Sequence, residues 1–168
     1  MNSYHRIALI WGVVMVFTLV KYDFFVLAQD EHATLRGLQG VCVIVEQLNP
    51  EIEQDGLARE QLQTDIEQKF RIARIKVLSP EEVLQVKGGP TFYLHVNVLK
   101  LRSGCYVYNI STKFIERVFP ERASYLIAAV TWEKPELLGF NCELSHIRAS
   151  AKKMVDRFIN AYSSVNSK

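Results

Sequence analysis

Alternation of apolar and polar residues in the second half of the chain most limits the folds it can adopt. In TFYLHVNVLKLR (91–102) nearly every second residue is apolar, and CYVYNISTKFIERVF (105–119) repeats the alternation after a Ser103-Gly104 turn. Pro120-Glu121 then turns the chain into RASYLIAAVTW (122–132). A period of two is that of a strand with one buried face, and short turns join antiparallel neighbours. These segments predict an antiparallel meander of three strands.

Helices are indicated at three other places, two by periodicity and one by a start signal. Apolar residues recur every three or four positions from Gly56 to Ala73, and again in a stripe near the carboxyl end: Leu144, Ile147, Ala151, Met154, Phe158 and Tyr162. This spacing predicts amphipathic helices. Between them, Ser79-Pro80-Glu81-Glu82 has the pattern of a capping box with proline at the first helical position. The cluster 88–90 (Gly-Gly-Pro) ends that short helix.

Two further segments predict strands in the first half. LQGVCVIVEQL (38–48) is almost continuously apolar, which is typical of an internal strand covered on both faces. Residues 75–78 form a short apolar run after the first long helix. The resulting order is β-α-β-α-β-β-β-α. We therefore expect an α+β fold, a two-layer sandwich with a mixed sheet of about five strands and helices packed mainly on one face.

The polar positions of the meander would then share the face that the helices leave open. This face is either in contact with water or a surface that meets a partner. The alternation assigns to it six residues: Tyr93, His95, Asn97, Asn109, Ser111 and Lys113.

The amino-terminal segment has the features of a secretory signal. Arg6 precedes fourteen uncharged, mostly apolar residues, Ile7 to Val20, and Val26-Leu27-Ala28 offers small or branched residues before a cut after Ala28. This predicts a signal peptide at 1–28, a single domain at 29–162, a flexible tail at 163–168, and a periplasmic or secreted protein. The alternative is an uncleaved inner-membrane anchor through residues 7–28.

Charge gives little indication of a nucleic-acid partner. The segment 1–28 contains Arg6, Lys21 and Asp23, so removing it from a chain with 20 basic and 18 acidic residues leaves a formal balance of +1. Nucleic-acid binding would need a strongly basic face.

The three cysteines have different expected roles. Cys105 opens the second strand of the meander and Cys142 follows the third, so both lie at one end of the sheet. In an oxidising compartment we expect them to form a disulfide that closes a loop of about 38 residues. Cys42, between two valines in the first strand, is expected to be a buried apolar residue.

Catalytic and metal-binding patterns are sparse. The sequence contains no GxGxxG, phosphate loop, GxSxG or HExxH. Cys142 and His146 have helical spacing for a thiol or metal site, but two ligands are too few for zinc and a disulfide would occupy Cys142. His95 is a further candidate general base. We assign no catalytic residue, cofactor or metal.

The order of elements resembles that of small periplasmic α/β modules such as the amino-terminal domain of TolB and relatives in envelope assembly lipoproteins. DGLAREQLQTDIEQKFRIARIKVLS (55–79) and RFINAYSSVNSK (157–168) are also similar to segments of secreted bacterial proteins of unassigned function. The resemblance implies a role in the bacterial envelope. The sequence thus favours a non-catalytic interaction or assembly module with an envelope protein as partner. The alternative is a small thiol- or His-dependent hydrolase, or a small-molecule binder, in the same compartment.

Overall fold

The computed structural model describes residues 32–122 and 124–166. The chain divides into two units, Met1–Thr34 and Leu35–Lys168, and the fold described below is that of the second. The predicted signal peptide, residues 1–28, lies outside the described residues. Among the described residues, no helix is both long enough and apolar enough to cross a membrane.

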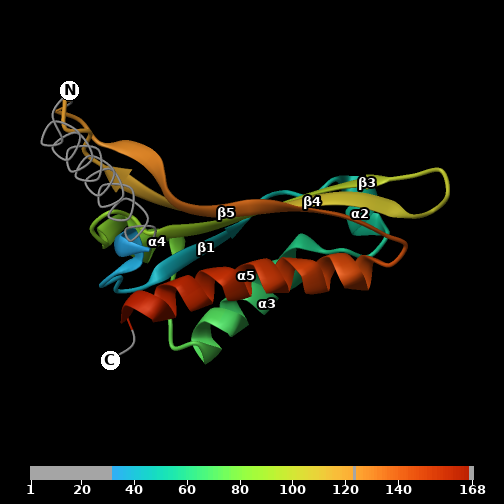
Figure 1. The fold of residues 1–168 in the computed structure, drawn as a ribbon, viewed down its shortest axis with the longest axis horizontal. Coiled ribbons are helices and arrows are strands. Elements are labelled where there is room, and N and C mark those ends of the chain that lie inside the picture. Colours follow the sequence, from blue (N-terminus) through green and yellow to red (C-terminus); the bar gives the residue numbers. More distant parts are fainter. Residues whose placement is uncertain (1–31, 123, 167–168) are drawn as a thin grey trace, which may run out of the picture. The chain divides into compact units, whose positions relative to one another are not determined.

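A mixed sheet of five strands forms one layer (Figure 1). Its strands are β1 (Val41–Val45), β2 (Val77–Leu78), β3 (Thr91–Lys100), β4 (Tyr106–Val118) and β5 (Ile127–Asn141), in the order β2-β1-β3-β4-β5. β1 is parallel to both its neighbours, whereas β3, β4 and β5 are antiparallel. The meander predicted from the alternation is therefore present.

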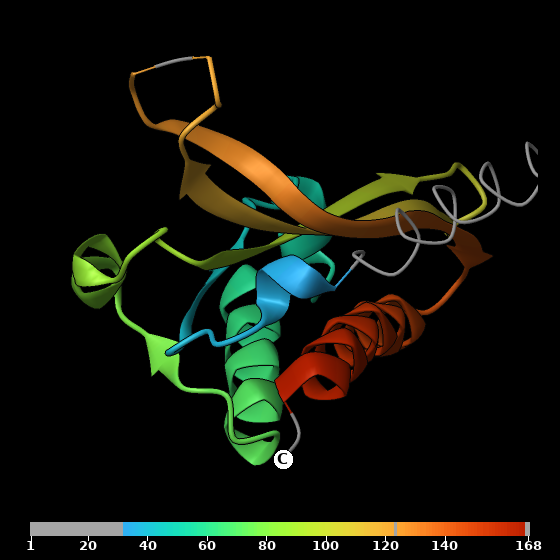
Figure 2. The same ribbon diagram turned by 60° about the vertical axis from the view of Figure 1, so that its left-hand side comes forward.

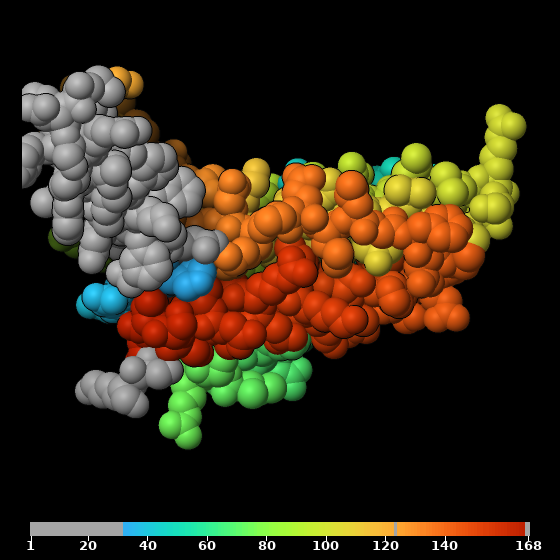
Figure 3. Space-filling model, in the orientation of Figure 1, coloured from blue at the N-terminus to red at the C-terminus, as the bar shows by residue number. Residues whose placement is uncertain are grey.

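Helices form the second layer. The two long helices, α3 (Arg59–Ile72) and α5 (Leu144–Asn166), both pack on one face of the sheet, and α5 lies against β5 in the space-filling view (Figures 1 and 3). The short helix α4 (Pro80–Gln85) lies apart from them, near β1 and β2 (Figure 2). The predicted α+β sandwich with helices mainly on one face is confirmed.

Local signals at the helix starts explain the short elements. Ser79 accepts from the backbone of Glu82, and the Glu82 side chain accepts from the Ser79 backbone, which is the predicted capping box of α4. A helix that the sequence reading missed, α2 (Pro50–Gln54), has Asn49 as its N-cap and proline at its first position. The segment 38–48 was expected to be one strand, but β1 ends at Val45 and α2 follows at Pro50.

The core between the layers is centred on Phe158 of α5. Its ring lies within 4.9–5.5 Å of the ring centroids of four aromatic residues from the other elements: Phe70, Phe92, Phe114 and Trp132. All five side chains are buried. The inward-facing side chains of β3 and β4 therefore pack against the apolar stripe of α5 in one cluster, and this cluster joins the two layers.

Charged side chains connect the two long helices. Arg148 of α5 donates two hydrogen bonds to Asp65 of α3, at 2.6 and 2.8 Å, and Lys152 lies 3.3 Å from the same carboxylate. Lys69 and Asp156 form a second pair between these helices. Cations beside Asp65 hold the pKa of its carboxyl below the ordinary value of 3.8.

The boundaries of the third meander strand differ from those expected. The third meander strand was predicted to span residues 122–132, but β5 starts at Ile127 and continues to Asn141 through Pro135. Proline is tolerated there because β5 is an edge strand of this sheet, where the missing N–H removes no ladder bond on the open side.

The carboxyl-terminal boundary also moves. α5 continues to Asn166, whose side chain donates to the carbonyl of Leu35 and accepts from the backbone of Gly37. Residues 163–166 therefore belong to the helix and not to the predicted tail. β1 is internal as expected, but Ile44 is 40% exposed, so its outer face is not fully covered.

Candidate functional site

The face of the meander that points away from α3 and α5, here called the outer face, holds the six polar residues predicted from the alternation. Cross-strand register places them in three direct pairs: Tyr93 with Lys113, His95 with Ser111, and Asn97 with Asn109. Asn97 is exposed and Ser111 is buried, while the other four are half-buried. The residues form one continuous polar patch along β3 and β4.

Glu46, just after β1, organises one end of this patch. The hydroxyl of Tyr93 donates to Glu46 Oε2 at 2.6 Å, and His95 Nε2 lies 3.7 Å from the same oxygen. The hydrogen bond to the carboxylate raises the pKa of Tyr93 to about 12, so the phenol stays protonated at neutral pH. Tyr93 is therefore a hydrogen-bond donor here and not a base.

The geometry around His95 does not complete a nucleophilic site. Ser111 is the register partner of His95 on β4, yet the two side chains share no hydrogen bond and Ser111 is only 5% exposed. A nucleophile and its base need to lie within hydrogen-bond reach of each other. What this pair offers is a polar contact surface.

An apolar row adjoins the polar patch on the same face. Leu99 pairs with Val107 across β3 and β4, and Val107 pairs with Phe140 across β4 and β5; Leu138 lies one pair further along, opposite Asn109. These four large side chains, here called the apolar row, are 40–73% exposed. The two long helices pack on the opposite face of the sheet, and nothing in the described residues covers these four side chains.

The sequence alone could predict the outward position of two members of the apolar row, but not of the other two. Leu99 and Val107 fall on the outer face by the same period of two that identified the polar residues. Leu138 and Phe140 lie beyond Trp132, where the sequence reading had ended the strand. Their place on the outer face depends on β5 continuing through Pro135.

A shallow depression of about 400 Å³ lies beside the polar patch, where β4 and β5 change register. Its lining consists of residues 111–113 and 133–136. At its border, Asn109 donates from Nδ2 to Oε2 of Glu136 at 2.6 Å. The buried hydroxyl of Thr112, in the lining, has no partner among the described residues. Lysines and glutamates alternate around this depression, so its charge is mixed.

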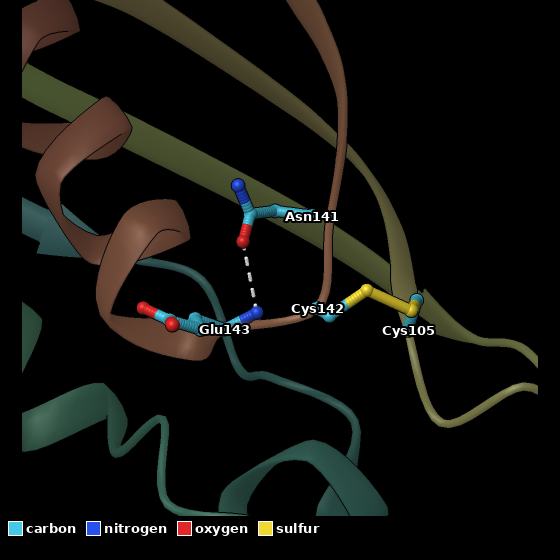
Figure 4. Close-up of a disulfide and its surroundings, with 4 residues drawn as sticks. All are labelled: Cys105, Asn141, Cys142 and Glu143. Atoms are coloured by element: carbon cyan, nitrogen blue, oxygen red, sulfur yellow. Dashed lines mark hydrogen bonds between the residues drawn. A yellow bond between two sulfur atoms is a disulfide. The ribbon is translucent and has the colours of Figure 1, made fainter.

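The cysteines are arranged as predicted. Cys105 and Cys142 form a disulfide that ties the start of β4 to the residue before the turn into α5, where Asn141 accepts from the backbone of Glu143 (Figure 4). While this bond is intact, Cys142 is neither a nucleophile nor a ligand for the predicted pair with His146. Cys42 is free and buried, and burial together with nearby Glu67 and Glu81 raises the pKa of its thiol. Reactive thiols require the opposite shift.

The described residues contain no group of three or more His, Cys, Asp or Glu side chains placed to hold a metal ion.

Comparison with known proteins adds no family. No protein-family model matches the chain, and no curated protein is significantly similar to it. The resemblance to TolB-like periplasmic modules therefore stays a prediction, and the candidate site depends on the geometry of the outer face.

Proposed function

We propose that this domain is a non-catalytic interaction module of the bacterial envelope that binds a partner protein through the outer face of β3, β4 and β5. The observation that carries the proposal is the apolar row. Exposed apolar side chains that are contiguous across three strands and bordered by polar groups are typical of protein interaction surfaces. In contrast, the inner face of the same strands is buried under α3 and α5.

The chemistry of the outer face indicates what a partner would present. The apolar row would be the dry centre of the contact, and Phe140, as the aromatic member, would contribute most of the binding energy. Asn97 beside it supplies hydrogen-bond donors, and Lys113, farther along the polar patch, supplies a positive charge. A matching partner therefore offers apolar side chains flanked by carbonyl or carboxylate oxygens.

Site-specific photocrosslinking in intact cells tests this proposal. A photoreactive amino acid replaces Phe140, and a tag after Lys168 allows the adduct to be isolated and its partner to be identified by mass spectrometry. We expect one defined adduct from position 140. The matched control is position 61, where Gln61 of α3 is exposed on the helix layer, and it should give none.

A second variant pair shows whether the adduct depends on the apolar row. Leu138→Asp should abolish the adduct formed from position 140, because it places a charge in the centre of the contact. Ile72→Asp changes an equally exposed apolar side chain on the last turn of α3 and should leave it unchanged. Equal adducts from positions 140 and 61, or an adduct insensitive to Leu138→Asp, would rule out the outer face as the binding surface.

A further inference from the structure

One end of the domain, here called the entry end, is defined by the starts of β1, β3 and β5 and the end of β4. Register places these together: Cys42 pairs with Thr91, Thr91 with Ile115, and Val118 with Ile127. The chain also enters the domain here. Leu35 and Gly37 precede β1, and their backbones form hydrogen bonds with the side chain of Asn166 at the end of α5.

Large apolar side chains are exposed at the entry end on two neighbouring elements. Phe119 and Tyr125 flank the β4–β5 turn, and Leu84 lies on α4; these three are 65–67% exposed, and Leu126 is 49% exposed. Arg117 joins the elements, since its side chain donates to the carbonyls of Leu84 and Val86 and its backbone to that of Gly88. The apolar groups therefore belong to one supported edge of the domain.

Charge is distributed unequally along the domain. The entry end has seven basic residues against five acidic ones: Arg36, Arg71, Arg74, Lys76, Lys87, Arg117 and Arg122 against Glu67, Glu81, Glu82, Glu116 and Glu121. The opposite end, which contains the disulfide and α2, has six acidic residues against three basic ones: Glu51, Glu53, Asp55, Glu60, Glu136 and Glu143 against Arg59, Lys100 and Arg102. Of the basic residues at the entry end, Arg71 and Lys76 are ion-paired, to Glu67 and Glu82, whereas the other five form no ion pair within the described residues. A positive field at this end is thus not neutralised locally.

The position of the entry end along the chain indicates what it meets. The apolar segment Ile7 to Val20 ends 15 residues before Leu35, and the predicted cut after Ala28 lies seven residues before it. Seven residues from Ala28 to Leu35 span at most about 25 Å when fully extended. A bilayer that receives the amino-terminal segment, whether transiently or as an anchor, would therefore lie within reach of this end of the domain.

We propose that the entry end docks on an anionic phospholipid surface, with Phe119, Tyr125 and Leu84 at the headgroup level and the unpaired basic side chains on lipid phosphates. Aromatic residues prefer the membrane–water interface, and clustered Lys and Arg are attracted to anionic leaflets. The disulfide end, with its acidic excess, would then point away from the lipid. This arrangement leaves the apolar row of the outer face accessible to a protein partner, so the two surfaces are independent.

A position-specific fluorescent probe on the full chain tests this docking. An environment-sensitive dye is attached to Tyr125→Cys, and in the control to Leu138→Cys, which is similarly exposed but lies toward the disulfide end. Cys42 is buried and the other two cysteines form the disulfide, so labelling is confined to the new thiol. With vesicles of equal parts phosphatidylglycerol and phosphatidylcholine, the dye at 125 should shift to the blue and the dye at 138 should not. Vesicles of phosphatidylcholine alone should shift neither.

Residues 7–20 could also bind vesicles, but they are the same in every variant. A difference in affinity between charge variants therefore reports on the entry end alone. Each basic side chain at an anionic surface contributes about fivefold to binding, so Lys87→Gln with Arg122→Gln should weaken the affinity read from the dye at 125 by about 25-fold. The matched pair Lys100→Gln with Arg102→Gln removes the same charge at the opposite end and should leave the affinity unchanged.

Several results would overturn the proposal. One is the absence of a blue shift at 125 with anionic vesicles, and another is a shift of the same size at 125 and 138. A shift at 125 that is as large with neutral as with anionic vesicles, or equal affinities for the two charge variants, would also overturn it. A dye at 125 that responds to lipid-free envelope extract but not to vesicles would assign the entry end to a protein instead.

Discussion

The ring of Tyr108 occupies the space that Gly139 leaves open on the neighbouring strand. The two residues are register partners on β4 and β5, and a Cβ atom at position 139 would lie only 2.2 Å from Cζ of the tyrosine. The Tyr108 hydroxyl also lies 3.2 Å from Oγ of Ser150 on α5, in a buried hydrogen bond. Gly139 therefore leaves room for the aromatic ring between the strand and the helix.

Gly139→Ala should destabilise the domain, because the added methyl group collides with a buried ring that has little room to move. We expect the free energy of unfolding to fall by about 1–3 kcal/mol, the usual cost of overpacking. Urea denaturation followed by circular dichroism measures it.

A double-mutant cycle identifies the collision as the cause. Tyr108→Leu removes the ring, so Gly139→Ala made in that background should cost clearly less than in the wild type. An equal cost in both backgrounds would mean that the glycine is required for another reason, such as the backbone of β5.

Phe158→Ala should be more damaging than any single change on the sheet surface. Phe158 contacts four other aromatic rings and is fully buried, so its removal leaves a large cavity at the junction of the two layers. We expect a loss of about 3–5 kcal/mol in the free energy of unfolding. Phe119→Ala is the control, because an exposed phenylalanine outside the core should change stability by less than about 0.5 kcal/mol. Similar losses for both variants would contradict the assignment of Phe158 as the centre of the core.

Much of this fold follows from local patterns. The alternation in β3 and β4 fixed which residues face the core, and it placed Tyr93, His95 and Asn97 together with their partners before any register was known. The Ser79 capping box and the stripe around Phe158 were equally clear. Each of these signals depends on residues within one element, where periodicity is a direct consequence of backbone geometry.

What the sequence did not predict depends on contacts between distant elements. The segment predicted as the third meander strand ended at Trp132, whereas β5 continues to Asn141 through Pro135, which an edge strand tolerates. Asn166 was assigned to a frayed tail because nothing local shows that Leu35 would lie beside it. The apolar row and the charge difference between the two ends likewise require the register of β4 and β5.

The Cys105–Cys142 disulfide should contribute substantially to stability. It closes a loop across a sequence separation of 37 residues, which corresponds to about 4 kcal/mol in the chain-entropy model. Replacing both cysteines with serine should lower the free energy of unfolding toward that amount. Dithiothreitol should lower the stability of the wild type to the level of the double variant and leave the double variant itself unchanged. A wild-type protein insensitive to reductant, despite a free-thiol assay showing reduction, would show that packing at this end is sufficient.

The Asp65 cluster between α3 and α5 should give part of the stability a defined pH dependence. Because Arg148 and Lys152 hold the pKa of Asp65 below its ordinary value of 3.8, the folded state binds its proton less readily than the unfolded state does. The resulting stabilisation is complete above the ordinary pKa and is lost as pH falls through the lowered one. Asp65→Asn keeps the shape but removes the charge, and we expect it to cost about 1–3 kcal/mol at neutral pH, as for hydrogen bonds to a charged group.

The measurement is urea denaturation of the wild type and Asp65→Asn at a series of pH values down to the acid transition. The difference between them should be constant above the ordinary pKa and should shrink below it, because the wild-type carboxyl is then neutralised as well. Glu60→Gln is the control: the Glu60 side chain is 79% exposed, and its replacement should change stability by less than about 0.5 kcal/mol at neutral pH. If the difference for Asp65→Asn did not shrink at acid pH, the loss would come from altered packing at the helix interface, since removal of charge alone predicts convergence.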